Sequence, residues 1–351
     1  MKKIFLTILT SALLFSACSE KNTELAGAGA TFPQPFYNVV FKEFAEQNNV
    51  NVTYGGIGSG GGVRSLKDKT VDFGASDAFL SDKELKDFGA EVVHIPTAMG
   101  AVVLCYNLQR VKGLKLTSEI ISDIYRDKIT NWNDPKIKAL NPELNLPDKK
   151  ITAVYRSDGS GTTYVFSDYM SKADENWKKE IGTGKTISVN AAPQGNAKVA
   201  AKGNPGVAGI IAQTDGAIGY VGSEYAFAMN LNSALLKNRS GNFVEADAQS
   251  ISAAADVDIP EDTRVSITNS ENPNAYPVSC FTWILVYKEQ NYNNRTAEQA
   301  KALVDLLKYV TGKDGQDFAV KTHYAEISDK AKNKAETLLK SITYGGKSVL
   351  N

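Results

Sequence analysis

The residues best suited to binding a ligand form one run, residues 155–163, which reads YRSDGSGTT. Apolar residues before it predict a strand, and its glycines predict a tight turn into a helix that begins at Ser160 or Gly161. The first N–H groups of a helix lack an intrahelical acceptor, so they favour an anion. Arg156 can give an oxyanion two parallel hydrogen bonds, and Asp158 is close enough in sequence to orient the guanidinium.

A second candidate is the glycine-rich run 55–62, GGIGSGGG, which follows the strand-like residues 50–54. It opens a helix-like stretch, residues 63–68, so Ser59 would offer its hydroxyl and N–H at a second helix start. The run also satisfies the G-x-G-x-x-G spacing of dinucleotide-binding folds, which makes NAD binding an alternative. Against it, no helix of ordinary length is predicted between Gly62 and the next strand.

Other chemistries find little support in the sequence. His94 and His323 are the only imidazoles, and no Cys/His cluster has metal-ligand spacing, so metal and triad catalysis are not expected. Residues 182–186 (GTGKT) resemble the end of a phosphate-binding P-loop, but the required first glycine is a lysine. Ser59 and Ser160 lack the G-x-S-x-G frame of a hydrolase nucleophile.

The elements that must position these residues alternate between helix and strand, which predicts α/β layers with largely parallel sheets. Serine and glutamate at the two ends of residues 81–84 form a capping box that opens a helix. Residues 237–275 are polar without periodicity and predict a loop-rich segment. The pattern predicts helices over residues 33–47, 118–124, 297–309 and 328–339, and strands over 50–54, 71–77, 101–106, 151–155, 217–221 and 281–287.

The bulk composition is that of a globular protein. The 351 residues are 42% hydrophobic and 22% charged, and the chain is long enough for two domains. Lys plus Arg equals Asp plus Glu at 39 each, so nothing in the charge points to nucleic acid or to an acidic membrane surface. Any attraction for an anion must therefore be local.

The amino terminus reads as an export signal over residues 1–17. Two lysines precede an apolar run, residues 4–15, which is too short to span a bilayer. Small residues then precede Cys18, an arrangement that resembles the lipobox of bacterial lipoproteins. We expect Cys18 to be lipidated and residues 18–24 to tether the protein to the membrane.

The other two cysteines, Cys105 and Cys280, lie in apolar, strand-like runs. The sequence favours two buried thiols. A disulfide is the alternative if the two strands are neighbours, because export exposes the chain to an oxidising compartment.

Five motifs follow one another along the chain: GAGATFP at 27–33, YGGIGS at 54–59, VDFGASD at 71–77, RSDGSGT at 156–162 and GAIGYV at 216–221. In this order they resemble the phosphate-binding subunit of bacterial high-affinity phosphate ABC transporters, and the resemblance covers nearly all of the mature chain. The sequence departs from that family at Gly60, where a second serine is common, and at Ser157, where alanine is common.

The resemblance implies a two-lobed periplasmic-binding-protein (Venus-flytrap) fold of type II, with the ligand in the interlobe cleft. Lobe one would comprise residues 25–98 and 281–351, and lobe two residues 99–280. The implied protein is a lipid-anchored, extracytoplasmic monomer that delivers phosphate to a transmembrane permease, without cofactor, metal or catalysis; a phosphatase is the enzyme alternative. The implied phosphate ligands are Thr31, Phe32 through its backbone N–H, Ser59, Asp77, Arg156, Ser160, Gly161 and Thr162, with Asp158 supporting the arginine.

Asp77 is unexpected among anion ligands, because two negative groups repel. An ionised carboxylate can only accept hydrogen bonds, so it tolerates an oxyanion that still carries a proton. Phosphate keeps a proton near neutral pH, whereas sulfate keeps none. We therefore expect Asp77 to determine the selectivity for phosphate over sulfate, although the residue alone would also suit a helix cap or a turn.

Overall fold

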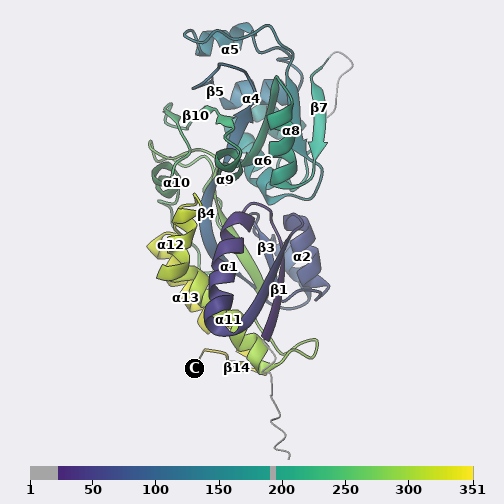
Figure 1. Ribbon diagram of the computed structural model, residues 1–351, viewed down its shortest axis with the longest axis vertical. Helices are drawn as coiled ribbons and strands as arrows, with labels where there is room; N and C mark the ends of the chain where they lie inside the picture. The colour runs from purple at the N-terminus through teal and green to yellow at the C-terminus, as the bar shows by residue number, and fades with distance from the viewer. Residues whose placement is uncertain (1–22, 190–194, 351) are drawn as a thin grey trace, which may run out of the picture.

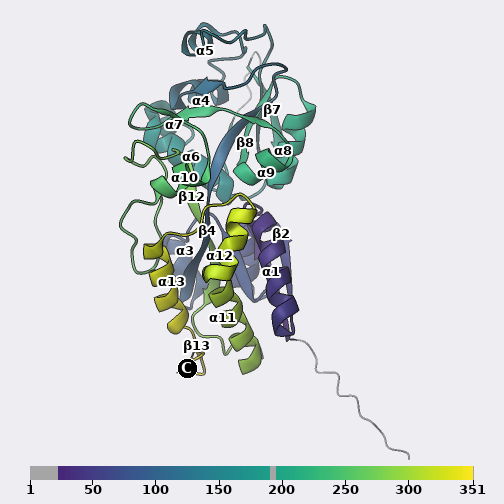
Figure 2. The same ribbon diagram turned by 60° about the vertical axis from the view of Figure 1, so that its left-hand side comes forward.

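The chain forms two lobes stacked along the long axis of the molecule (Figure 1). They are seen in a computed structural model that describes residues 23–189 and 195–350. The first lobe combines the amino-terminal strands with the carboxy-terminal helices, and the second lobe contains the middle of the chain. Figure 2 shows α11 and α12 beside α1, with α13 on their other side, so segments from the two ends of the sequence build one lobe together.

The first lobe contains β1 (Thr23–Gly29), α1 (Gln34–Asn48), β2 (Val50–Gly56), α2 (Ser59–Lys67), β3 (Phe73–Ser76), α3 (Asp82–Phe88), α11 (Ala297–Thr311), α12 (Lys313–Lys321), α13 (Asp329–Lys340), β13 (Thr343–Tyr344) and β14 (Lys347–Ser348). The second lobe contains β5 (Lys115–Leu116), α4 (Ser118–Tyr125), α5 (Pro135–Leu140), β6 (Thr152–Arg156), α6 (Gly161–Ala173), α7 (Glu175–Glu180), β7 (Ala197–Ala201), α8 (Gly203–Gln213), β8 (Ala217–Gly222), α9 (Ser223–Ala228), β9 (Asn232–Ser233), β10 (Leu235–Lys237), β11 (Phe243–Val244) and α10 (Ala248–Ala254). Two strands, β4 (Val92–Tyr106) and β12 (Ser279–Tyr287), lie where the lobes meet.

A mixed sheet runs through both lobes in the order β2-β1-β3-β12-β4-β8-β6-β7. Inside each lobe the neighbours are parallel: β1 with β2 and β3, and β6 with β7 and β8. The strands at the junction are antiparallel to their neighbours, because β12 pairs with β3 and β4, and β4 pairs with β8. The α/β class is confirmed, and the parallel pairing holds within the lobes but not at the junction.

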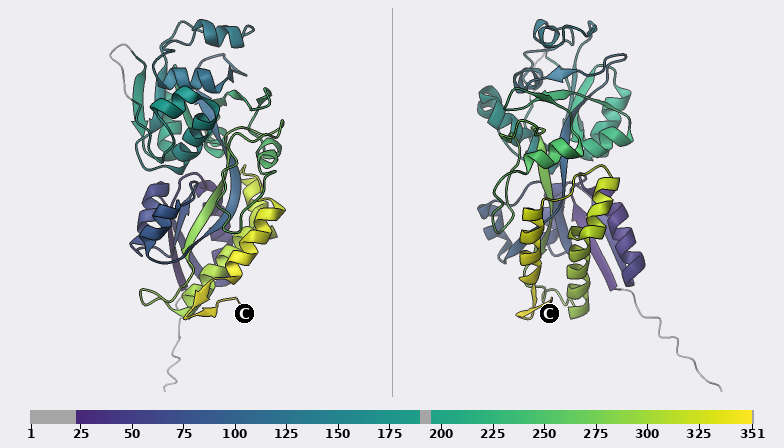
Figure 3. Two further views of the ribbon diagram at one scale, coloured as in Figure 1. Left: turned by 180° about the vertical axis from the view of Figure 1, so that it is seen from behind. Right: turned by 90° about the vertical axis from the view of Figure 1, so that its left-hand side faces the viewer.

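The strand β4 continues through the junction and carries an irregularity there (Figure 3). Trp283 of β12 lies opposite Pro96, and Thr282 lies opposite Ala98, so Thr97 is an extra residue. Proline cannot donate to a sheet ladder and is tolerated beside such a bulge. At this bulge the hydroxyl of Thr97 donates to the carbonyl oxygen of Thr282, at 3.2 Å.

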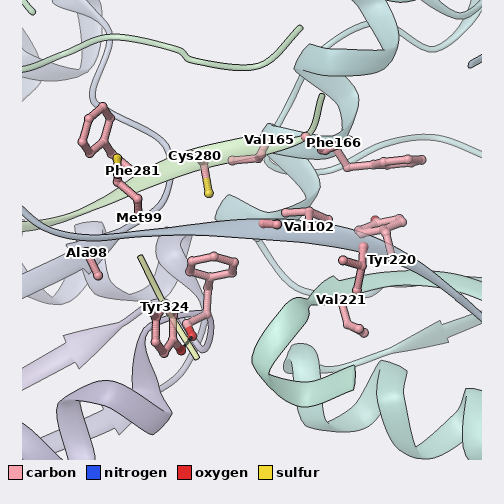
Figure 4. Close-up of a cluster of buried hydrophobic side chains, with 14 of the residues drawn as sticks. Ala98, Met99, Val102, Val165, Phe166, Tyr220, Val221, Cys280, Phe281 and Tyr324 are labelled. Atoms are coloured by element: carbon pink, nitrogen blue, oxygen red, sulfur yellow. Dashed lines mark hydrogen bonds between the residues drawn. The ribbon is translucent and has the colours of Figure 1, made fainter. Parts of the chain in front are cut away.

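Apolar side chains fill the space around β4 and β12 from one lobe to the other (Figure 4). Met99 and Phe281 lie on the first-lobe side, and Val102 lies beside α6 and β8 of the second. The rings of Phe166 and Tyr220 stack there with centroids 4.3 Å apart, which packs α6 against β8. This packing holds the start of α6 at the junction.

Most predicted elements are confirmed to within one or two residues, and Ser81 and Glu84 form the expected capping box. Helix α2 begins at Ser59, the second helix start that the sequence predicted, and it includes three glycines of the run, so the helical stretch predicted over residues 63–68 began too late. Only residues 63–67 of this helix follow Gly62. The pattern also gave no sign of α12 or of α10, which lies inside the loop-rich segment.

Cys105 and Cys280 are buried, free thiols. Strand register places Cys280 opposite Gly100 rather than opposite Cys105, so the two sulfur-bearing positions are offset along β4. Cys18 lies outside the described residues. Within the described ranges no helix has both the length and the apolar character needed to cross a membrane.

Candidate functional site

The starts of helices α2 and α6 face each other where the lobes meet. Each helix follows a strand of its own lobe through a short turn, so the first N–H groups of both helices, which lack intrahelical acceptors, lie at the junction. The N–H of Gly60 donates to the carbonyl oxygen of Gly159 at 2.9 Å, and the N–H of Gly161 donates to Ser59 Oγ at 3.1 Å. The two helix starts predicted to bind an anion are therefore in contact across the junction.

Arg156 supplies the positive charge of this region. It ends β6 as predicted, and only 4% of its surface is exposed. Asp158 accepts from Nε at 2.7 Å and from Nη2 at 2.6 Å. The third guanidinium nitrogen, Nη1, is buried and has no hydrogen-bond partner among residues 23–189 and 195–350. A buried charged donor without an acceptor is costly, so this nitrogen is available for an anionic ligand.

Asp158 orients the arginine, as the sequence suggested. Its Oδ1 also accepts the N–H of Gly203 at 3.0 Å, which fixes the carboxylate from the side of α8. Burial by itself would raise the pKa of Asp158, but the hydrogen bonds and charge of Arg156 hold that pKa below its usual value. Asp158 is thus ionised, and both of its carboxylate oxygens accept hydrogen bonds from Arg156.

Asp77 follows β3 and is buried at 3% exposure. Its Oδ1 accepts a hydrogen bond of 2.8 Å from the hydroxyl of Thr282, the residue beside the β4 bulge. Burial raises the pKa of Asp77 to about 7, although the Thr282 hydroxyl and the charge of Arg156 act in the opposite direction. The second oxygen, Oδ2, faces the start of α6, because a side chain added at Gly161 would meet it at 2.6 Å.

The hydroxyl of Ser59 is restricted to donating its proton. Its oxygen accepts the N–H of Asp77 at 3.3 Å and the N–H of Gly161 at 3.1 Å. A serine hydroxyl has two lone pairs and one proton, so two incoming donors leave only the proton for a further partner. A ligand that accepts hydrogen bonds, such as an oxyanion, satisfies this hydroxyl.

Every residue predicted as a ligand is buried at the junction of the lobes. Ser160 caps α6, since its hydroxyl accepts the N–H of Thr163 at 3.0 Å. The ring of Phe32 packs edge-on against the ring of Tyr324, with centroids 5.8 Å apart. Only the backbone of Phe32 can therefore offer a polar group to a ligand. Ser59, Asp77 and Gly161 contact one another, and Thr31 and Thr162 both bond to Asn204. The charge of Arg156 acts on Asp77, and Phe32 and Ser160 are the sequence neighbours of Thr31 and Gly161.

Three residues at the site were not predicted from the sequence. Thr282 contacts Asp77, Tyr225 donates to the carbonyl oxygen of Thr31 at 2.6 Å, and Asn204 contacts Thr31. A signal existed for Asn204: it follows a strand and a glycine at a helix start, the pattern that marks Ser160. Thr282 and Tyr225 gave no local signal.

Known proteins are similar to this chain over most of its length. The family model described as the PBP superfamily domain matches residues 16–313. The phosphate-binding protein PstS of Xylella fastidiosa is 37% identical over 89% of this chain and 84% of its own length. The PstS of Pasteurella multocida is 35% identical over 94% of each chain.

Solved structures share the fold at low sequence identity. A high-affinity periplasmic phosphate-binding protein with bound phosphate matches with a TM-score of 0.72 at 20% identity, over 90% of this chain and 93% of that one. A putative phosphate ABC transporter substrate-binding protein of Clostridium perfringens matches with a TM-score of 0.63 at 20% identity, over 87% of this chain and 100% of that one. The two-lobed fold expected from the sequence is thus confirmed.

Proposed function

Because the chain belongs to the phosphate-binding proteins of the PBP superfamily, we propose that it captures inorganic phosphate between its lobes and delivers it to the permease of an ABC transporter. It is a binding protein, not an enzyme. The observation that carries the proposal is Arg156 Nη1, a buried cationic donor with no partner in the described chain, set among helix starts and a donating hydroxyl. Such a site suits a small oxyanion.

The proposed ligand set combines several hydrogen-bond donors with one acceptor, Asp77. Arg156 supplies the charge, supported by Asp158, and Asp77 accepts a hydrogen bond from the protonated oxygen of the ligand. The remaining ligands donate: hydroxyl groups of Thr31, Ser59, Ser160 and Thr162, and backbone N–H groups of Phe32, Ser59 and Thr162. Gly161 acts through Ser59, because its N–H donates to Ser59 Oγ at 3.1 Å. This arrangement matches phosphate that keeps a proton.

Phosphate held in this way bridges the two lobes. We assign residues 25–98 and 281–351 to one lobe and residues 99–280 to the other, with the crossing of β4 and β12 as the hinge. Thr31, Ser59 and Asp77 then lie on one side and Arg156 on the other, so a bound anion favours the closed form. The closed form is what a permease would distinguish from the empty protein.

A titration tests this function directly. Calorimetry should show one phosphate bound per monomer, with no heat from NAD. Incubation with p-nitrophenyl phosphate should release no product, because the chain performs no chemistry on its ligand. Stoichiometric NAD binding without phosphate binding, or steady hydrolysis of the ester, would contradict the proposal.

The sulfate affinity is predicted to rise as the pH falls. Asp77 with a pKa of about 7 is mostly protonated at pH 6 and can then donate to sulfate, whereas at pH 8 it is mostly ionised and repels it. If only the protonated form binds, sulfate should bind roughly tenfold more tightly at pH 6 than at pH 8. Sulfate itself does not titrate in this range, so calorimetry with sulfate isolates Asp77. Asp77→Asn should show no such trend.

We also propose that Cys18 carries a lipid that anchors the exported protein to a membrane outside the cytoplasm. The support is the export signal of residues 1–17 and the small residues before Cys18. The unaltered protein should sediment with membranes and gain the mass of acyl chains, while Cys18→Ser should appear in the soluble fraction without that mass. Equal fractionation of the two proteins would refute the anchor.

A further inference from the structure

Asn204 reaches the site from the first turn of α8 and is fully buried. Its Nδ2 lies 3.1 Å from Thr31 Oγ1 and 3.1 Å from Thr162 Oγ1, and its backbone N–H also donates to Thr31 Oγ1 at 3.1 Å. Its Oδ1 accepts the N–H of Gly222 at 3.0 Å. The bond to Gly222 orients the amide, so that its NH₂ group faces both threonines.

These bonds determine what the two hydroxyls can do. A threonine hydroxyl has one proton and two lone pairs. Asn204 gives two N–H groups to Thr31 Oγ1, which occupies both lone pairs, and one to Thr162 Oγ1. The Thr31 hydroxyl can then only donate, and the proton of Thr162 is directed away from Asn204.

We propose that Asn204 is a positioning residue for phosphate, which turns the hydroxyls of Thr31 and Thr162 into donors toward the bound anion. The inference rests on the proposed function and adds a residue to it. Asn204 itself does not need to touch the ligand. Without the side-chain amide, Thr31 Oγ1 would keep only the backbone N–H of residue 204 and Thr162 Oγ1 would lose its donor. Each hydroxyl could then accept a hydrogen bond, so the site would be less selective for an acceptor-rich anion.

The same contacts make the donor set depend on lobe closure. Thr31 belongs to the first lobe, whereas Asn204 and Thr162 belong to the second. Tyr225 of α9 also reaches across and donates to the carbonyl oxygen of Thr31 at 2.6 Å. Thr31 therefore acquires its fixed donor role only when the second lobe meets the first, so closure completes the site.

A double-mutant cycle tests the inference. Asn204→Ala and Thr31→Val should each weaken phosphate binding roughly 10- to 100-fold in calorimetry. Because Asn204 acts partly through the Thr31 hydroxyl, the double variant should lose at least about fivefold less than the product of the single effects. Fully multiplicative effects would mean that Asn204 does not act through Thr31, and would overturn the inference.

Asn204→Asp provides a second variant of nearly identical shape. A carboxylate only accepts, so it would take the protons of both hydroxyls and should bind phosphate more weakly than Asn204→Ala. A role in packing alone predicts the opposite order, because aspartate preserves the shape of asparagine. Phosphate binding by Asn204→Asp at the level of the unaltered protein would also overturn the inference.

Asn141→Ala is the matched control, since Asn141 is buried in the same lobe and, among residues 23–189 and 195–350, its amide bonds only to backbone groups of Lys115 and Ile137. It should lower the ligand-free thermal midpoint but leave the phosphate affinity within about twofold.

The same titrations separate the proposed function from the proposed role of Asn204. Failure of the unaltered protein to bind phosphate would refute the proposed function, whereas normal binding by Asn204→Ala alone would refute only the role of Asn204.

Discussion

Arg156→Ala is expected to reduce phosphate affinity roughly 30- to 5,000-fold, since removing a buried, hydrogen-bonded charge from an interface costs about 2–5 kcal/mol. The side chain has 1% exposure and leaves one nitrogen, Nη1, unpaired in the described chain. It is also the source of the positive charge that acts on Asp77. Isothermal titration with phosphate measures the loss.

Two further variants separate charge from geometry. Arg156→Lys keeps the charge, but a single ammonium cannot bond to Asp158 in two places and still meet the ligand, so an intermediate loss is expected. Arg126→Ala is the control, because Arg126 is a partly buried arginine of the same lobe that pairs with Asp123 and Glu180. If the Arg156→Ala variant bound phosphate with an affinity within about fivefold of that of the unaltered protein, Arg156 could not be the central ligand.

Asp77→Asn is expected to narrow the preference for phosphate over sulfate roughly 5- to 150-fold, since an unsatisfied buried polar group costs about 1–3 kcal/mol. With sulfate, the ionised Asp77 faces an oxyanion that has no proton to give. An asparagine amide can donate instead, so sulfate should gain affinity while phosphate loses its acceptor. A competition assay at pH 8, where Asp77 is ionised, measures the ratio.

The stability of the ligand-free protein provides an independent check. Burial raises the pKa of Asp77 from 3.8 to about 7, so the folded chain holds this proton more tightly than the unfolded chain does. The folded state therefore loses stability as the pH rises between these values. Asp77→Asn should unfold at a higher temperature than the unaltered protein at pH 8, with a smaller difference at pH 5.

Asp168→Asn is the control for both Asp77 experiments. Asp168 is a partly buried aspartate whose carboxylate already accepts from the hydroxyls of Ser266 and Thr268. Its replacement should leave the phosphate to sulfate ratio unchanged. A ratio for Asp77→Asn equal to that of Asp168→Asn would mean that selectivity resides elsewhere in the site.

Much of the site could be predicted from the sequence, because its parts are local. The turn from β6 into α6 places Arg156 two residues from Asp158 and Ser160 three residues from the N–H that it caps. Hydrogen bonds over such short separations depend on residue type and spacing alone. The capping box of α3 and the amphipathic spacing of α1, α11 and α13 are local in the same sense.

Other features depended on contacts that no local pattern encodes. The sequence predicted helical residues only over 63–68, because glycine disfavours helices, yet residues 60–62 are already part of α2. Gly62 packs so closely that an added side chain would meet Gly29 at 2.4 Å, so tertiary contact with β1 overrides the propensity. The helix α12 was also not predicted from the sequence. Its residue Gln316 is buried and donates to the carbonyl oxygen of Thr97, a contact between residues that lie far apart in the sequence.

The sequence alone determined the anion-binding turn, its arginine and the hydroxyls around it. Tertiary structure decided how those groups behave: Thr282 lies 205 residues from the Asp77 that it contacts, and Asn204 lies 173 residues from Thr31. The pKa of Asp77 follows from burial, and the donor role of Thr31 follows from lone pairs filled by the other lobe. Both properties arise from desolvation and hydrogen bonding that exist only after distant segments pack together.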